Sequence, residues 1–118
     1  MRQMHGDERR AQIAKMILSV CLNRNVLFPS NMFNDHAWII LLTLFIAHAE
    51  NRILSKSEVI HKLGANAETC TRWIKYLIQS RQVFDIEKGK DLILSDETIS
   101  RLRSVFDDVI TEIYGFSK

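Results

Sequence analysis

A stretch in the second half of the chain carries hydroxyl, amide and cationic side chains at helical spacing. Residues 65–77 read ANAETCTRWIKYL, and Asn66 is a residue type that caps helices. A Thr hydroxyl can contact a base or a phosphate, and Arg can form a bidentate pair with guanine. The residues that we expect to face a DNA groove are Asn66, Ala67, Glu68, Thr69, Thr71 and Arg72, with Lys75 one turn further on for a phosphate.

A solvated helix face is the alternative interpretation of the same residues. Cys70, Ile74 and Leu77 recur at i, i+4 and i+7, which is the spacing of a buried helical face. Glu68 favours the alternative, because a carboxylate repels phosphates unless it accepts a hydrogen bond from cytosine. Trp73 adjoins the buried face, and either packs partly in the core or covers a neighbouring hairpin.

Motifs for catalysis and for metal binding do not occur in the sequence. The two cysteines and four histidines have neither CxxC nor HExxH spacing, and there is no GxGxxG, P-loop or GxSxG pattern. We therefore expect no enzymatic activity, no metal site and no cofactor. Cys21 and Cys70 are expected to be small buried hydrophobes, with a redox sensor as the alternative.

Composition and length indicate one globular domain. The chain has 118 residues, of which 47% are hydrophobic and 25% are charged. Its polar start, MRQMHGDERR, lacks the apolar segment of a signal peptide. The longest apolar run, residues 37–47, is shorter than the roughly 20 residues that span a bilayer. We expect a cytoplasmic protein without a membrane segment.

Positive charge is concentrated in the middle of the sequence. Residues 52–90 contain eight basic and four acidic side chains, a net charge of +4. The preceding residues carry +1 and residues 91–118 carry −3. Nucleic-acid binders concentrate charge in this way, because cations that neutralise phosphates release counterions. The excess is mild, and an ordinary solvated surface would also account for it.

Hydrophobic periodicity predicts five helices, one very short strand and one hairpin. The expected helices cover residues 7–22, 36–50, 57–63, 67–80 and 96–115. A strand is expected at 52–54, a hairpin at 83–94 around Gly89, and a loop with the only proline at 23–34. Residues 36–50 are apolar almost all round, so this helix should be the central buried one.

The order helix, short helix, tight turn, helix and hairpin is typical of a winged helix-turn-helix. We place this motif and its wing at residues 55–94, within a single domain that covers residues 1–118. The predicted fold is mainly α with a small β-hairpin wing and with additional N- and C-terminal helices. The residues that would contact phosphates beside the second helix are Lys56, Ser57, Lys88 and Lys90.

Residues 56–97, KSEVIHKLGANAETCTRWIKYLIQSRQVFDIEKGKDLILSDE, resemble the winged-helix core of MarR-like bacterial transcription regulators. In that family the recognition helix opens with a small polar residue. A Thr, then a Thr or Ser, and then an Arg follow it. Asn66, Thr69, Thr71 and Arg72 match this pattern here. Residues 32–45, MFNDHAWIILLTLF, are similar to the segment that precedes the motif in a subgroup of the family. The resemblance implies a two-fold dimer, and a small-molecule effector pocket between the dimerisation and DNA-binding parts, although no residue identifies an effector.

Two features depart from the family pattern. Near the end of the recognition helix the family has glycine, whereas this chain has Arg81. Either Arg81 adopts a left-handed conformation at a cost of roughly 1 kcal/mol, or the helix ends differently. The wing is also short, with only Lys88 and Lys90 beside Gly89. We therefore expect the wing to contact phosphates rather than to read the minor groove.

The two terminal helices each carry an apolar stripe that must be buried somewhere. We predict that residues 7–22 and 96–115 are dimerisation helices. The stripe residues are Ile13, Met16, Ile17, Val20, Leu102, Phe106, Val109, Ile110 and Ile113. The sequence does not decide whether these helices pair with a second copy or fold back on their own domain.

Two functional hypotheses follow from these patterns. The first is a homodimeric regulator of transcription that binds double-stranded DNA in a sequence-specific way. The second is a winged-helix module that binds protein and does not bind DNA. The low net charge, Glu68 and the short wing favour the second hypothesis, and a steep salt dependence of DNA binding would discriminate between them.

Overall fold

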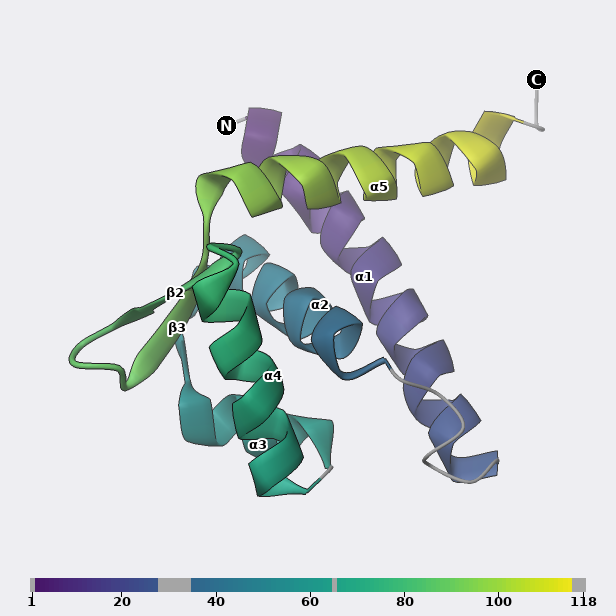
Figure 1. The fold of residues 1–118 in the computed structure, drawn as a ribbon. Helices are drawn as coiled ribbons and strands as arrows, with labels where there is room; N and C mark the ends of the chain where they lie inside the picture. The colour runs from purple at the N-terminus through teal and green to yellow at the C-terminus, as the bar shows by residue number, and fades with distance from the viewer. Residues whose placement is uncertain (1, 28–34, 65, 116–118) are drawn as a thin grey trace.

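The computed structural model describes residues 2–27, 35–64 and 66–115 of the chain. Within these residues the fold is mainly helical, with five helices and a small antiparallel sheet of three strands (Figure 1). The helices are α1 (Arg2–Leu27), α2 (His36–Ala49), α3 (Lys56–Leu63), α4 (Ala67–Gln79) and α5 (Asp96–Gly115). The strands are β1 (Leu54–Ser55), β2 (Val83–Ile86) and β3 (Asp91–Leu94).

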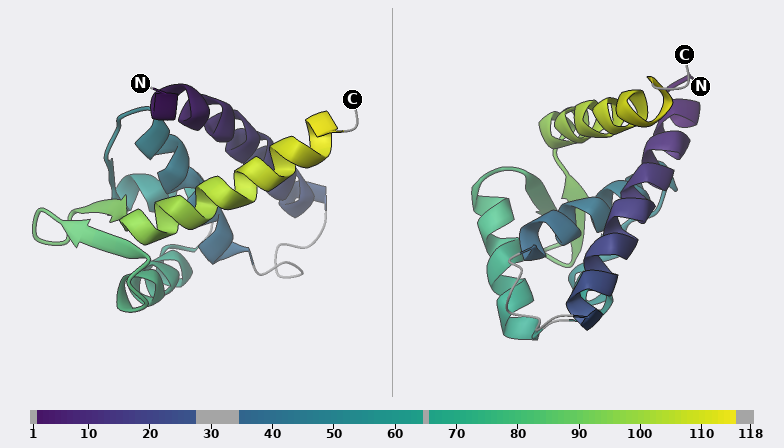
Figure 2. Two further views of the ribbon diagram at one scale, coloured as in Figure 1. Left: turned by 90° about the horizontal axis from the view of Figure 1, so that it is seen from above. Right: turned by 90° about the vertical axis from the view of Figure 1, so that its right-hand side faces the viewer.

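The central position predicted for residues 36–50 is confirmed. Helix α2 lies between α1 on one side and α4 on the other, and the hairpin β2–β3 projects on the side away from α1 (Figures 1 and 2). Its side chains from Ile39 to Ala47 are buried apart from Leu41, which is partly buried. The one polar residue among them, Thr43, donates its hydroxyl to the Ile39 carbonyl at 2.7 Å, so its burial leaves no unpaired donor.

Three predicted boundaries need correction. Helix α1 begins at Arg2 instead of residue 7 and ends at Leu27 instead of residue 22, so the part of the expected loop at residues 23–27 is helical. The remainder of that loop, residues 28–34 with Pro29, lies outside the described residues. Strand β1 follows Arg52 instead of including it, because the Arg52 N–H still donates to the Ala47 carbonyl at the end of α2.

The hairpin predicted at residues 83–94 is confirmed, and it belongs to a larger sheet. The strand order is β1–β3–β2, with both pairs antiparallel. Val83 is paired with Leu94, and Leu54 is paired with Leu92. These four side chains are buried, so the sheet is fixed to the core through one face of each strand.

Helix ends in the described chain follow well-known capping patterns. The Ser55 hydroxyl accepts the Glu58 N–H and the Glu58 carboxylate accepts the Ser55 N–H, each at 3.1 Å, which is a capping box. Gly64 ends α3 with φ +65°. Arg81 adopts the left-handed conformation, with φ +62°, which was one of the two alternatives left open by the sequence.

Helices α1 and α5 pack on each other within the chain (Figure 2). Buried Asp7 on α1 accepts two hydrogen bonds from Arg103 on α5, at 2.9 and 2.7 Å, and one from Arg10 at 3.0 Å. Arg10 in turn donates to Asp107 at 2.8 and 2.9 Å. The terminal helices therefore fold back onto their own domain and are joined there by a network of two carboxylates and two guanidinium groups.

Hydropathy excludes a membrane span in the described residues, where no helix is both long and apolar enough to cross a bilayer.

Candidate nucleic-acid interface

The start of α4 is fixed by its two flanking turns. The chain leaves α3 at Gly64, and the Asn66 side-chain oxygen accepts the Glu68 N–H at 2.8 Å, which caps α4. Cys70, Ile74 and Leu77 are buried, as their spacing predicts. These contacts position the helix so that its opposite face points to solvent.

Most of the residues predicted to contact DNA are exposed in the first turns of α4. The exposed residues are Asn66, Ala67, Glu68, Thr71, Arg72 and Lys75, whereas Thr69 is partly buried. On a helical projection, Glu68, Arg72 and Lys75 lie at the centre of the outward face, and Thr71 lies at its edge. The structure thus brings a cationic pair and one carboxylate together on one surface, which we name the α4 face and define by Glu68, Arg72 and Lys75.

Thr71 has less hydrogen-bonding capacity than its sequence position implies. Its hydroxyl donates to the Ala67 carbonyl at 2.7 Å, so the proton already has an acceptor. The oxygen can still accept a hydrogen bond, and the methyl group can contact a thymine methyl. Asn66 is in a similar position, because its side-chain oxygen is used by the cap and only its amide group can donate outward.

An aromatic pair beside the α4 face was not identified from the sequence. Trp73 is partly buried, as expected, and Tyr76 packs edge-on against it, with ring centroids 5.8 Å apart and planes at 84°. Tyr76 is 54% exposed, and it follows Arg72 by one helical turn. This i, i+4 spacing is the signal that would have placed Tyr76 beside the predicted contact residues.

The structure places Lys56 at the hairpin as well as at the start of α3. The Lys56 N–H donates to the Lys90 carbonyl at 2.9 Å. A side chain added at Gly89 would lie 3.6 Å from the Lys56 ammonium and 3.3 Å from an Asp85 carboxylate oxygen. Lys56 thus lies close to Lys88 and Lys90 at the tip of the hairpin, although Asp85 reduces the local positive charge.

The hairpin tip has an unusual backbone. Glu87, Lys88 and Gly89 have φ values of +53°, +57° and +81°, and the Lys90 N–H donates to the Ile86 carbonyl at 3.0 Å. Left-handed conformations of non-glycine residues cost about 1 kcal/mol each. Lys88 and Lys90 are exposed, and so is Ser57 near the start of α3. Ser55, rather than Ser57, caps that helix.

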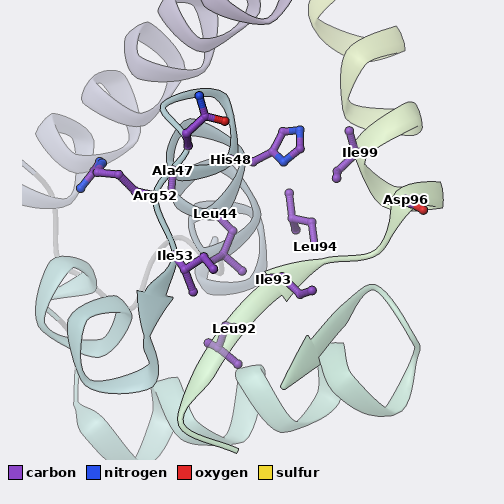
Figure 3. A pocket seen from close by; sticks show the side chains of 11 residues that line it. Leu44, Ala47, His48, Arg52, Ile53, Leu92, Ile93, Leu94, Asp96 and Ile99 are labelled. Atoms are coloured by element: carbon purple, nitrogen blue, oxygen red, sulfur yellow. The ribbon is translucent and has the colours of Figure 1, made fainter. Parts of the chain in front are cut away.

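A separate apolar cavity of about 380 Å³ lies between the end of α2, β3 and the start of α5 (Figure 3). Leu44, Leu94 and Ile99 line it, and the His48 ring points towards α5 (Figure 3). Arg52 also lines this cavity, and its side chain extends towards α1 (Figure 3). The effector pocket implied by the family resemblance stays a prediction, because the cavity lining does not select a ligand.

The residues predicted to form a dimer fall into two groups. Ile13, Leu102 and Phe106 are buried within the chain, and Phe106 packs against Phe45 with ring centroids 4.9 Å apart. This corrects the expectation that they face a partner. Met16, Val20 and Ile113 are exposed, and Ile17, Val109 and Ile110 are partly buried. Only these six remain available for a second copy.

Both cysteines are buried, as the sequence predicted for small hydrophobes, and neither forms a disulfide. Cys21 lies on α1, and Cys70 lies on the core side of α4.

Comparison with protein-family models, with curated proteins and with solved structures finds no match to this chain.

Proposed function

We propose that the chain is a winged helix-turn-helix regulator of transcription that binds double-stranded DNA as a two-fold homodimer. The observation that carries the proposal is the order α2, β1, α3, α4, β2, β3 with a capped, partly exposed α4. In helix-turn-helix proteins the second helix of the motif enters the major groove with its N-terminal residues towards the bases. The outward position of Arg72 and Lys75 supports this role for α4.

Affinity and specificity would come from different residues. Lys75, Lys56, Lys88 and Lys90 would neutralise phosphates and fix the position of the domain on the duplex. Arg72 would donate two hydrogen bonds to a guanine, and Thr71 would contribute its methyl group and an acceptor. A two-fold dimer would place two copies of α4 in successive major grooves, about 34 Å apart.

A protein-binding module without DNA binding is the second candidate. Glu68 lies in the exposed first turn of α4, and Asp85 lies beside Lys56 at the hairpin. Both carboxylates oppose the approach of phosphates. The exposed Tyr76 and Phe84 would suit a protein partner, because aromatic residues are enriched at such interfaces.

The test is fluorescence anisotropy on a random 30-base-pair duplex and on DNA upstream of the chain's own gene, across a salt series. We expect affinity to fall steeply between 50 and 200 mM salt, since each phosphate contact adds about −0.9 to the slope of log K against log salt. Arg72→Ala should weaken binding to specific DNA by about 1–3 kcal/mol.

Arg101→Ala is the matched control, because Arg101 is exposed on α5 and pairs with Glu97 at 2.5 Å, outside the α4 face. It should leave the affinity for DNA unchanged. If neither duplex binds at 50 mM salt, the regulator proposal fails and the protein-binding module is favoured.

A further inference from the structure

A second pocket, of about 410 Å³, lies where α1, α2, α3 and the segment leading into β1 meet. Its lining residues are Lys15, Leu18 and Leu22 from α1, Thr43, Ile46 and Glu50 from α2 and its end, and Arg52, Leu54 and Lys62. None of the contacts proposed for DNA uses these side chains. The volume is within the range of about 300–1,000 Å³ that is typical of small-molecule sites.

The apolar part of the pocket is entirely aliphatic. Leu18, Leu22, Ile46 and Leu54 supply it, and the lining contains no aromatic side chain. The Thr43 hydroxyl does not need a ligand atom as its hydrogen-bond acceptor, because it already donates to the Ile39 carbonyl. An alkyl chain therefore fits this surface better than a planar ring, which would find no aromatic partner for stacking.

Positive charge surrounds this aliphatic surface. Lys15 and Arg52 each form an ion pair with Glu50, at 2.9 and 2.6 Å. Hydrogen bonds from Lys15, which has the largest effect, and from Arg52 hold the pKa of Glu50 below its usual value. Glu50 is therefore ionised at neutral pH. Lys62 forms no ion pair with a described residue, so the lining holds three cations against one carboxylate.

Lys62 is well placed to bind an anion at the pocket. The nearest acidic residue along α3, Glu58, accepts the Ser55 N–H in the capping box, and it interacts with the charges of Lys62 and Arg52 without forming an ion pair with Lys62. Lys62 is exposed and can keep its ammonium in water while its methylene groups cover apolar surface. Arg52 lines both this pocket and the cavity of Figure 3, and its side chain extends towards α1 in that view.

We propose that this pocket binds a small organic anion with an aliphatic body, of the class of medium-chain carboxylates. The carboxylate would lie between Lys62 and Arg52, and the alkyl chain would lie on Leu18, Leu22 and Ile46. The inference rests on the lining of the pocket alone and does not depend on the proposed DNA binding.

The first experiment is calorimetric titration of the full chain with octanoate, hexanoate, acetate and 1-octanol. We expect octanoate to bind about tenfold more tightly than hexanoate, because two further methylenes leave water. Acetate should give no measurable binding, and 1-octanol should bind more weakly than octanoate. If octanoate does not bind, or if 1-octanol binds as tightly, the proposal is wrong.

Substitutions then locate the site. Lys62→Met removes the charge from an exposed position while keeping a long side chain, and it should weaken octanoate binding about fivefold. Lys62→Arg should restore it. Lys75→Met, on the α4 face, is the matched control and should have no effect. Equal weakening by Lys62→Met and Lys75→Met would mean nonspecific attraction and would overturn the site.

A readout independent of affinity is methyl NMR of the octanoate titration. The methyl resonances of Leu18, Leu22 and Ile46 should shift in wild type, and those of Leu94 and Ile99, in the cavity of Figure 3, should not. Shifts confined to Leu94 and Ile99 would place the ligand in the other cavity and refute the proposal.

Discussion

Arg81 shows how one residue can be unfavourable locally and still be compatible with the fold. It ends α4 in a left-handed conformation, with φ +62°. The Gln82 N–H donates to the Leu77 carbonyl at 3.0 Å and the Arg81 N–H donates to the Ile78 carbonyl at 3.1 Å. This pair of bonds is a Schellman motif, in which the position of Arg81 usually holds glycine.

Arg81→Gly should therefore stabilise the protein. Glycine adopts positive φ without a steric penalty, so the free energy of unfolding should rise by about 0.5–1 kcal/mol. Urea denaturation measures the change. Gln79→Gly, within α4 and exposed, is the control and should lower the free energy of unfolding by about 1 kcal/mol. A loss of stability in Arg81→Gly would show that contacts of the arginine side chain outweigh the strain.

The same residue illustrates what the sequence could predict at this scale. Because glycine is absent where α4 must end, the sequence left two possibilities, a positive φ at Arg81 or a different helix end, and the structure shows the first. The positive φ values of Glu87 and Lys88 were not expected, because the register of the hairpin decides how many residues the turn must hold. Likewise the Thr71 hydrogen bond to Ala67 depends on a side-chain rotamer that spacing does not reveal.

At the scale of elements, the contact between α1 and α5 depends on Asp7. Burial by itself would raise the pKa of Asp7, but hydrogen bonds from Arg103 and Arg10 outweigh it and leave the pKa below 3.8. The pKa of Asp107 is also lowered, chiefly by its hydrogen bond from Arg10. Both carboxylates therefore stabilise the folded state in their ionised form.

Asp7→Asn should destabilise the protein at neutral pH by about 2–3 kcal/mol, because it leaves Arg103 and Arg10 without their shared carboxylate. The contribution of Asp7 is complete above its unfolded pKa near 3.8 and is lost as the pH falls through the lower folded value. The difference between wild type and Asp7→Asn should thus shrink as the pH falls below about 3.8. Thermal unfolding across this range measures it.

Glu97→Gln provides the comparison for this pH series. Glu97 pairs with Arg101 on the exposed side of α5, and such surface pairs contribute less than about 1 kcal/mol. Its melting temperature should follow wild type at every pH. An Asp7→Asn variant with the same behaviour would show that the network does not hold α1 against α5.

The number and type of the elements were predictable, and the contact between the first and last was not. The apolar spacing of 36–50 and 67–80 and the alternation of 83–94 identified α2, α4 and the hairpin. The sequence placed Asp7 at the start of the helix predicted at residues 7–22, whereas Asp7 lies within α1 and pairs with a residue 96 positions away. Such a partner depends on the packing of the two helices, which sequence periodicity does not give.

At the scale of the whole molecule, the exposed part of the apolar stripe on α1 is the strongest reason to expect a second copy. Met16 is 58% exposed and Val20 is 64% exposed, one turn apart on the same helix. Both border a groove with Ile17, Cys21 and Trp38. Exposing these side chains on a monomer is unfavourable, because apolar area gains about 25 cal/mol per Å² when it leaves water.

Val20→Glu should convert the proposed dimer into a monomer without unfolding it. The side chain is exposed in the single chain, so the change removes no core contact, whereas two carboxylates near a two-fold interface would be desolvated and would repel each other. Sedimentation velocity should show wild type at twice the mass of Val20→Glu, with equal helical circular dichroism. Ile53→Glu, 59% exposed and away from α1, is the control and should remain dimeric. If wild type sediments as a monomer at concentrations where it binds DNA, the two-fold arrangement fails. The spacing of about 34 Å between two copies of α4 would then have no basis.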